Sequence, residues 1–335
     1  MSARVLPYNA AGIAAGAALI RGGEAVAFRT ETVYGLGCNA YDAAAVARVF
    51  AAKGRPQDNP LIVHLSDPAA LGAVAENIPD FARFLADCFM PGPLSLVLPK
   101  NDKIPPCVTA GRDTVAVRVP SDGGARAFIA ACGVPVAAPS ANVSGRPSPT
   151  AAAHVLADLG DRIPLILGEG SCPVGLESTV LDCTEYPPRI LREGGVTREQ
   201  IEDALGVSLN KGAVSAAGAP KAPGMKYTHY APSVPLYLLE FAEAFDLKTV
   251  AAKIPFGTRA AVIALNRSIY EGLSGLQVPI IRAGDTAAEG ARGLYAALLE
   301  NEKAYDMLVA VLVPDVGIGR AVNNRLRKAA GGKML

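Results

Sequence analysis

The stretch of residues 28–64 constrains the fold of this chain most strongly, because its strand-like ends flank a short helix and a dense polar turn. Asp42 can cap that helix, and Gly54 can end it in a left-handed turn. The turn KGRPQDNP then places Lys53 and Arg55 two residues apart in extended backbone, so both side chains can point at one anion. A lone KxR pair is more often a solvated basic turn, so its meaning depends on the rest of the chain.

The composition excludes several classes of protein. At 335 residues the chain is long enough for two domains, and a net charge of +1 gives it no overall attraction to nucleic acid or membrane. Its six cysteines form no CxxC pair and its three histidines lie far apart, which argues against a zinc site or a disulfide framework. The apolar run at residues 10–20 is too short to span a bilayer and is typical of an amphipathic first helix. We therefore expect a cytoplasmic protein with no membrane contact and no metal held by side chains.

The strand expected at residues 114–120 carries an arginine in apolar surroundings. Its three valines share one face, and Arg118 lies on the opposite face with small residues. A buried guanidinium without an anionic partner would cost several kcal/mol, so Arg118 needs such a partner. That partner is either a ligand or the carboxylate of a structural salt bridge, and the sequence leaves both open.

A second loop brings hydrogen-bonding residues to the end of a strand. The segment PVAAPSANVSGRPSPT begins as a small-residue strand and breaks into a Ser/Pro/Gly loop, in which Ser140 and Asn142 stand two residues apart. They belong to a dispersed set of cations and small hydrogen-bonding residues that suits a ligand carrying phosphate and carboxylate groups. The other members of this set are Lys53, Arg55, Asn59, Arg118, Ser148 and Arg192. The chain has no P-loop, no GxGxxG turn after a strand and no GxSxG elbow. The residues alone therefore predict a small anionic ligand.

The chain divides into three segments by composition and by the expected pattern of strands and helices. Residues 1–206 alternate strands and helices, and residues 207–233 are rich in Gly, Pro and small residues. Because that stretch ends in a cluster of tyrosine, histidine and lysine, we expect a partly ordered linker. Residues 234–335 restart the alternation and predict a smaller α/β domain with a mainly parallel sheet. Its helices are expected at residues 241–252, 286–303 and 321–330.

Several motifs, taken in order, carry a resemblance to a known family. TETVYGLG, KGRPQDNPLIVH and PSANVSGRPSPT resemble the YrdC-type family, whose hallmark is the pairing of KxR with SxN. APGMKYTHYAP and GIGRAVNNRLRKAA are similar to the linker and C-terminal domain of its longer form, the two-domain threonylcarbamoyl-AMP synthases. The resemblance implies an α/β fold with a twisted open sheet and a concave basic cavity, plus a smaller Rossmann-like domain.

The family's reaction is implied in the same way. L-Threonine, bicarbonate or CO2, and ATP carried with Mg2+ give threonylcarbamoyl-AMP and pyrophosphate, so the chain would be a nucleotidyltransferase. A tRNA-threonylcarbamoyl transferase complex would receive the product and modify the adenosine beside the anticodon of tRNAs that read ANN codons. A weak direct contact with tRNA, and a monomeric or dimeric state, stay open.

The resemblance also implies roles for individual residues. Lys53 and Arg55 are expected to be catalytic, stabilising the charge that develops on the phosphates. The linker at residues 207–233 is expected to close over the active site, where Tyr230 shields the adenylate from water. The implied contacts to L-threonine are Thr32, His64, Arg118 and Ser178. The implied contacts to ATP are Lys53, Arg55, Asn59, Thr114, Ala138, Ser140, Asn142, Ser148, Arg192 and Tyr230.

Other interpretations remain beside this one. The chain could be a module that binds double-stranded RNA or tRNA without synthase activity, although it lacks a sustained basic stripe. The carbamoyltransferase of hydrogenase maturation should carry CxxC pairs and further domains, and a purely regulatory role leaves the KxR and SxN motifs unexplained. His64 could be a satisfied core histidine, and Cys38 is expected to be a buried structural thiol. For the C-terminal domain, anchoring of a lid, regulation and dimerisation are all compatible with the sequence.

Overall fold

The computed structural model describes residues 2–210, 229–242 and 244–335, and the chain forms two compact units within it. The first unit consists of Met1–Ser144, Pro149–Cys172 and Glu177–Tyr227. The second consists of Thr228–Leu335 together with the short segments Gly145–Ser148 and Pro173–Leu176. The centre of the expected linker, residues 211–228, lies outside the described residues, and the domain limits expected at 206 and 234 stay a prediction.

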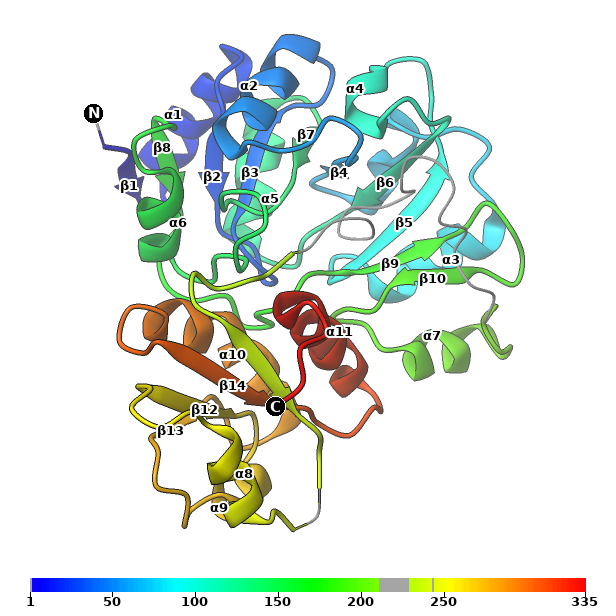
Figure 1. The fold of residues 1–335 in the computed structure, drawn as a ribbon. Helices are drawn as coiled ribbons and strands as arrows, with labels where there is room; N and C mark the ends of the chain where they lie inside the picture. Colours follow the sequence, from blue (N-terminus) through cyan, green and yellow to red (C-terminus); the bar gives the residue numbers. More distant parts are fainter. Residues whose placement is uncertain (1, 211–228, 243) are drawn as a thin grey trace. The chain divides into compact units, whose positions relative to one another are not determined.

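A ten-stranded mixed sheet forms the first unit (Figure 1), and it confirms the twisted α/β fold. Its strand order is β1-β8-β2-β3-β7-β4-β6-β5-β9-β10. The strands are β1 Arg4–Leu6, β2 Val26–Phe28, β3 Gly35–Asn39, β4 Ile62–His64, β5 Leu94–Pro99, β6 Thr114–Arg118, β7 Val136–Ala138, β8 Leu165–Leu167, β9 Thr179–Asp182 and β10 Arg189–Arg192. The helices are α1 Ala10–Arg21, α2 Ala43–Lys53, the 3-10 helix η1 Pro68–Ala73, α3 Asp80–Phe89, α4 Pro106–Thr109, α5 Gly123–Cys132, α6 Ala152–Leu159 and α7 Arg198–Leu205.

Local sequence explains where helix α2 starts and stops. The Asp42 carboxylate accepts the backbone N–H groups of Ala44 and Ala45, and Gly54 adopts the left-handed conformation with a φ of 60°. These were the predicted start and stop. Helix α5 was not predicted, because its sequence begins with the turn-like pair Gly123–Gly124. The helix forms there because the Asp122 carboxylate caps it and an apolar stripe packs on the sheet.

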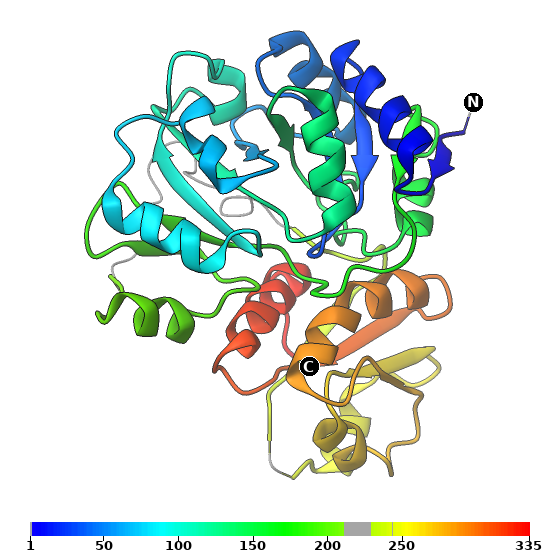
Figure 2. The ribbon, with the colours of Figure 1, turned by 180° about the vertical axis from the view of Figure 1, so that it is seen from behind.

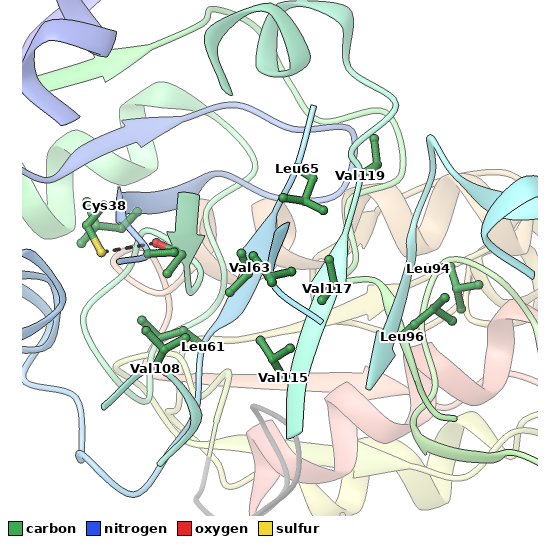
Figure 3. Close-up of a cluster of buried hydrophobic side chains, with 14 of the residues drawn as sticks. Cys38, Leu61, Val63, Leu65, Leu94, Leu96, Val108, Val115, Val117 and Val119 are labelled. Carbon is green, nitrogen blue, oxygen red and sulfur yellow. Dashed lines mark hydrogen bonds between the residues drawn. The ribbon is translucent and has the colours of Figure 1, made fainter. Parts of the chain in front are cut away.

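The two faces of the sheet differ in what they pack against. Leu61, Val63 and Leu65 at β4, with Val115, Val117 and Val119 at β6, join the main apolar core, as Figure 3 shows. On the opposite face, α1 and α5 pack together over β2, β7 and β8 (Figure 2). Farther along that face, Ile62, Val97, Ala116 and Val180 form a separate small cluster across β4, β6, β5 and β9. The predicted separation of the β6 valines from Arg118 is therefore confirmed.

The second unit is a four-stranded parallel sheet with the order β11-β14-β12-β13, which confirms the smaller α/β domain and its predicted parallel pairing. Its elements are β11 Leu236–Leu239, α8 Leu247–Lys253, β12 Ala260–Ala264, α9 Arg267–Gly272, β13 Ile280–Arg282, α10 Ala287–Asn301, β14 Met307–Val311 and α11 Ile318–Ala330. The start predicted for α8 at residue 241 is wrong, because Asp246 caps the helix and fixes its first turn. Helix α11 begins three residues earlier than predicted.

No helix in the part of the chain that the structure describes is long and apolar enough to cross a membrane.

Candidate active site

The KxR and SxN motifs meet in the structure through the Lys53 ammonium group. Lys53 is the last residue of α2 and is almost fully buried. Its Nζ donates to the backbone carbonyl of Ser140 at 2.5 Å and also to that of Asn142. The Ser140 hydroxyl in turn donates to the Asn142 amide oxygen at 2.5 Å. Lys53 thus fixes the loop after β7, and the backbone rather than the side chains of the SxN motif forms the direct link.

Arg55 organises the turn that joins α2 to β4. Its guanidinium donates to the backbone carbonyls of Asn59 at 3.1 Å and Pro60 at 2.9 Å, and it lies 6.0 Å from the centre of the Phe50 ring. Asn59 is buried, and its side-chain oxygen has no hydrogen-bond partner among the described residues. A buried amide oxygen in that state is disfavoured unless a ligand or water supplies a donor. The turn therefore combines the Arg55 cation with a buried hydrogen-bond acceptor on Asn59.

Burial makes Lys53 an unusual lysine. Desolvation lowers its pKa well below the ordinary value, the nearby Arg55 charge lowers it further, and Asp158 opposes both effects. An anion that arrived at this group would relieve the unfavourable burial of the cation. The prediction that Lys53 and Arg55 can bind one anion stays a prediction, since the two side chains donate to separate carbonyl groups.

Arg118 finds its anionic partner within the protein. Its Nη2 lies 2.6 Å from the Glu31 carboxylate, and both side chains are buried. Its Nη1 donates to the Thr32 hydroxyl at 2.8 Å, and its Nε donates to the Gly92 carbonyl at 3.3 Å. Of the two alternatives that the sequence left open, a salt bridge to a carboxylate of the chain is the one present here. A role for Arg118 toward a substrate carboxylate is compatible with it and stays a prediction.

His64 is the neighbour of Arg118 across the β4–β6 pair. It is buried, its Nδ1 lies 3.1 Å from the Ile62 carbonyl, and its ring meets the Phe28 ring edge-on at 5.9 Å. Desolvation, followed by the Arg118 charge, lowers the pKa of His64 to about 3 although two backbone carbonyls oppose the shift. The imidazole is therefore neutral near pH 7, so it can exchange hydrogen bonds with a ligand but offers it no positive charge.

Ser178 and Arg192 form a third polar group, located at strands β9 and β10 at the edge of the sheet. The Arg192 guanidinium donates to the Ser178 carbonyl at 2.9 Å and to its hydroxyl at 3.2 Å. The Ser178 hydroxyl also lies 2.8 Å from that of Ser95 on β5. The resemblance assigned Ser178 to L-threonine and Arg192 to ATP, and the structure brings the two into direct contact.

Strand pairing explains why these polar side chains share one face. His64 pairs with Arg118, and both Ser95 and Arg192 pair with Val180 in the register of the sheet. Because paired residues point to the same side, the polar side chains form a row next to the small cluster of Ile62, Val97, Ala116 and Val180. Thr114 opens β6 on this face, and Ala138 pairs with Ile62.

Two of the expected ATP contacts, Ser148 and Tyr230, belong to the second unit and are described within it. Both are buried. Tyr230 has a positive φ of 69°, and its ring lies 5.5 Å from that of Tyr295 and 5.6 Å from the Arg325 guanidinium. Within the second unit Tyr230 is thus a packed residue held in an uncommon backbone conformation.

The sequence interpretation missed Glu31 and Ser95. Glu31 lies inside the TETVYGLG motif, and it was the carboxylate that Arg118 required. Ser95 interrupts the leucines of β5 at an alternating position, so strand periodicity could have placed it on the face of Arg118. Both are short polar signals in otherwise apolar segments.

Two family models match the chain. One, described as telomere recombination (Sua5, YciO and YrdC), matches residues 18–194, and one described as threonylcarbamoyl-AMP synthase, C-terminal domain, matches residues 196–331. The chain is 44% identical to the threonylcarbamoyl-AMP synthase of Bacillus subtilis (strain 168), with 98% of this chain and 96% of the relative covered. It is also 44% identical to the threonylcarbamoyl-AMP synthase of Pyrococcus abyssi, with 96% of this chain and 94% of the relative covered.

Solved structures give the same result. The crystal structure of Pyrococcus abyssi Sua5 complexed with L-threonine superposes with a TM-score of 0.89 at 41% identity, covering all of this chain and 99% of that one. Escherichia coli YciO, at 23% identity and a TM-score of 0.52, shares the fold over 57% of this chain. The motif resemblance is thereby confirmed, and the chain belongs to the two-domain threonylcarbamoyl-AMP synthase family.

Proposed function

We propose that this chain is an L-threonylcarbamoyladenylate synthase, a nucleotidyltransferase that converts L-threonine, bicarbonate or CO2, and ATP into threonylcarbamoyl-AMP and pyrophosphate. Membership of the family supports this activity along the whole chain. The product is the activated group used to form N6-threonylcarbamoyladenosine in tRNAs that read ANN codons. We assign the downstream step to a tRNA-threonylcarbamoyl transferase complex, as the resemblance implied.

One observation carries the assignment of the site. The Lys53 ammonium contacts the loop that follows Ala138, the partner of Ile62 at the start of β4, whereas His64, the partner of Arg118, ends β4. A strand of that length spans roughly 10 Å, which suits a ligand with a carboxylate at one end and phosphates at the other. In this proposal Thr32, His64, Arg118 and Ser178 take L-threonine.

The ATP end of the site is larger. In this proposal the residues that take ATP are Lys53, Arg55, Asn59, Thr114, Ala138, Ser140, Asn142, Ser148, Arg192 and Tyr230. Arg192, assigned to ATP, donates a hydrogen bond to Ser178, assigned to L-threonine, so the two proposed subsites adjoin there.

In the proposed mechanism the neutral amine of threonine attacks CO2, forming a C–N bond and releasing one proton. The resulting carbamate oxygen then attacks the α-phosphorus of ATP, and the bond to the β-phosphate oxygen breaks to release pyrophosphate. Lys53 has two of its three N–H groups on loop carbonyls, so one remains for a phosphate oxygen. The chemistry uses no cysteine nucleophile, and burial raises the pKa of the Cys38 thiol well above its ordinary value.

Mg2+ is expected to arrive with ATP. Within the described ranges no three or more His, Cys, Asp and Glu side chains form a metal cage. Mg2+ commonly keeps several waters and binds through substrate phosphates, so such a cage is not required. Lys53, Arg55 and Asn59 would hold the phosphates that carry the ion, which would neutralise phosphate charge during transfer.

The test of the proposed function is pyrophosphate release by the purified full chain with ATP, Mg2+ and bicarbonate, with and without L-threonine. Release that requires both threonine and bicarbonate supports the synthase. ATP turnover that is indifferent to threonine would refute the assigned substrate. Absence of turnover, together with salt-sensitive tRNA binding, would favour the RNA-binding alternative.

A further inference from the structure

The buried carboxylate of Glu31 pairs with Arg118 but has no contact to a substrate in the site as proposed so far. Glu31 precedes Thr32 in the chain, and its side chain is 5% exposed. Its Oε1 lies 2.6 Å from Arg118 Nη2, yet the approach is an ion pair rather than an aligned hydrogen bond. Neither Glu31 oxygen has a hydrogen-bond partner in the part of the chain that the structure describes, and the same is true of Arg118 Nη2.

A buried ion pair of this kind is incomplete. Buried charges are normally satisfied by hydrogen bonds as well as by their counter-ion, because desolvation of each ion costs several kcal/mol. The other nitrogens of Arg118 do have partners, Thr32 and Gly92. The unused hydrogen-bonding capacity is therefore concentrated at the contact between Glu31 and Arg118, where one acceptor and one donor group lie side by side.

That arrangement matches one kind of ligand. A free α-amino acid carries a carboxylate and an ammonium on the same carbon, so its charges are separated by only a few bonds. A guanidinium edge complements the carboxylate, and a carboxylate complements the ammonium. An apolar pocket with Arg118 alone would recognise any small carboxylic acid, whereas the addition of Glu31 distinguishes an amino acid from its deaminated counterpart.

We propose that Glu31 binds the α-ammonium group of L-threonine on arrival, before that group loses a proton to become the attacking amine, while Arg118 binds its carboxylate, so that the ion pair receives a zwitterion. The inference rests on the proposed function and adds to it a residue that sets substrate specificity. On binding, the substrate supplies the hydrogen bonds that both protein ions lack. No net charge enters the buried site, because the substrate zwitterion and the ion pair are each neutral.

A purely structural role for Glu31 makes a different prediction. If Glu31 only held Arg118 in place, its loss would weaken every ligand whose carboxylate binds Arg118, with or without an amine. Comparing L-threonine with 3-hydroxybutyrate separates the two roles, because 3-hydroxybutyrate has the same carbon chain and hydroxyl group but lacks the amine.

The experiment measures the dissociation constants of both ligands by calorimetry on the full chain, for the wild type and for Glu31→Gln. We expect wild-type protein to prefer L-threonine strongly. In Glu31→Gln the affinity for L-threonine should fall about ten- to hundredfold, the loss typical of one charged hydrogen bond. The affinity for 3-hydroxybutyrate should stay the same or rise, so the ratio of the two constants should collapse.

Asp122→Asn provides a matched control, since Asp122 is a largely buried carboxylate of the first unit that pairs with Arg29 at 2.9 Å. It should lower the melting temperature without changing the ligand ratio. An equal loss for both ligands in Glu31→Gln, or an unchanged ratio, would overturn the proposal for Glu31.

Two further outcomes distinguish a folding defect of the variant, and a failure of the proposed function, from a failure of the proposal for Glu31. If Glu31→Gln does not fold, Glu31→Asp keeps the charge but withdraws it, and it should give an intermediate ratio; the wild-type ratio there would contradict the proposal. Wild-type protein that binds no threonine, or releases pyrophosphate without it, would instead refute the proposed function itself.

Discussion

Replacing Lys53 with methionine should abolish most activity while leaving the fold nearly as stable. Methionine keeps an unbranched side chain of similar volume, one heavy atom shorter, but removes the ammonium. The loss comprises two charge-assisted hydrogen bonds to the Ser140 and Asn142 carbonyls, each about 1.5–3 kcal/mol. The gain is relief from burying a cation, a penalty of several kcal/mol that the lowered pKa of Lys53 reflects. Because the two terms oppose each other, we expect the free energy of unfolding to change by no more than about 2 kcal/mol.

Activity should respond differently. A preorganised cation aimed at developing phosphate charge contributes about 3–4 kcal/mol to transition-state stabilisation, so kcat/KM should fall roughly 100- to 1,000-fold. The assay is threonine-dependent pyrophosphate release, with urea unfolding of the same samples. Arg48→Met is a suitable control, because Arg48 is a cation of the same helix that donates to the Gly23 carbonyl outside the site. A Lys53→Met enzyme within about threefold of wild-type kcat/KM would refute the assigned role of Lys53.

Three further predictions follow from local geometry. Gly194→Ala would place a Cβ 2.3 Å from the Ser178 backbone, so it should destabilise the protein by about 1–3 kcal/mol or more and weaken threonine binding. In the control Gly123→Ala the new Cβ meets no atom within 4 Å. That variant should keep the wild-type threonine affinity in calorimetry and the wild-type melting temperature. The pKa of His64 is about 3 in the folded protein and about 6.5 in the unfolded chain, so its neutral form stabilises the fold above pH 6.5 and that stability is lost as the pH falls. At pH 5 the free energy of unfolding, measured in urea, should fall by about 2 kcal/mol more for wild-type protein than for His64→Gln. Equal losses would contradict the burial of a neutral ring. A thiol reagent should label Cys88, which is exposed, before the buried cysteines and without loss of synthase activity, as read by mass spectrometry; rapid labelling of Cys38 would contradict its burial.

Much of the fold could be predicted because its local signals agree with its tertiary packing. Asp42 caps the start of α2 and Gly54 stops its end, each through contacts to residues within one helical turn. The capping box of Thr197 with Gln200 marks the start of α7 in the same local way. Such signals depend on neighbours a few residues away, so periodicity and turn chemistry suffice to find them. Helix α8 could not be placed correctly because the apolar residues before Asp246 continue the helical pattern without taking part in the helix.

The candidate site was harder to predict because its contacts are distant in sequence. Strand alternation placed Arg118 on the correct face, but no local pattern could choose Glu31, some 87 residues earlier, as its partner. Likewise the two motifs that carry the resemblance meet through backbone carbonyls, which leave no trace in residue identity. Residue types therefore indicate the class of ligand, whereas the pairing of strands decides which side chains share it.

Gly145–Ser148 and Pro173–Leu176 belong to the second unit, although both lie within the part of the sequence that otherwise forms the first unit. The chain therefore cannot be divided into its two units by a single cut. Arg146 pairs with Glu302, and Gly175 approaches the Arg292 backbone so closely that a Cβ would lie 2.4 Å from its Cα. Both segments are encoded within the first 206 residues, but the residues that complete them come after residue 290. A gene truncated between the halves would therefore delete the Glu302 carboxylate and the Arg292 backbone along with the C-terminal sheet. Shortening such a protein, by design or by evolution, requires both of these loops to be rewritten as well.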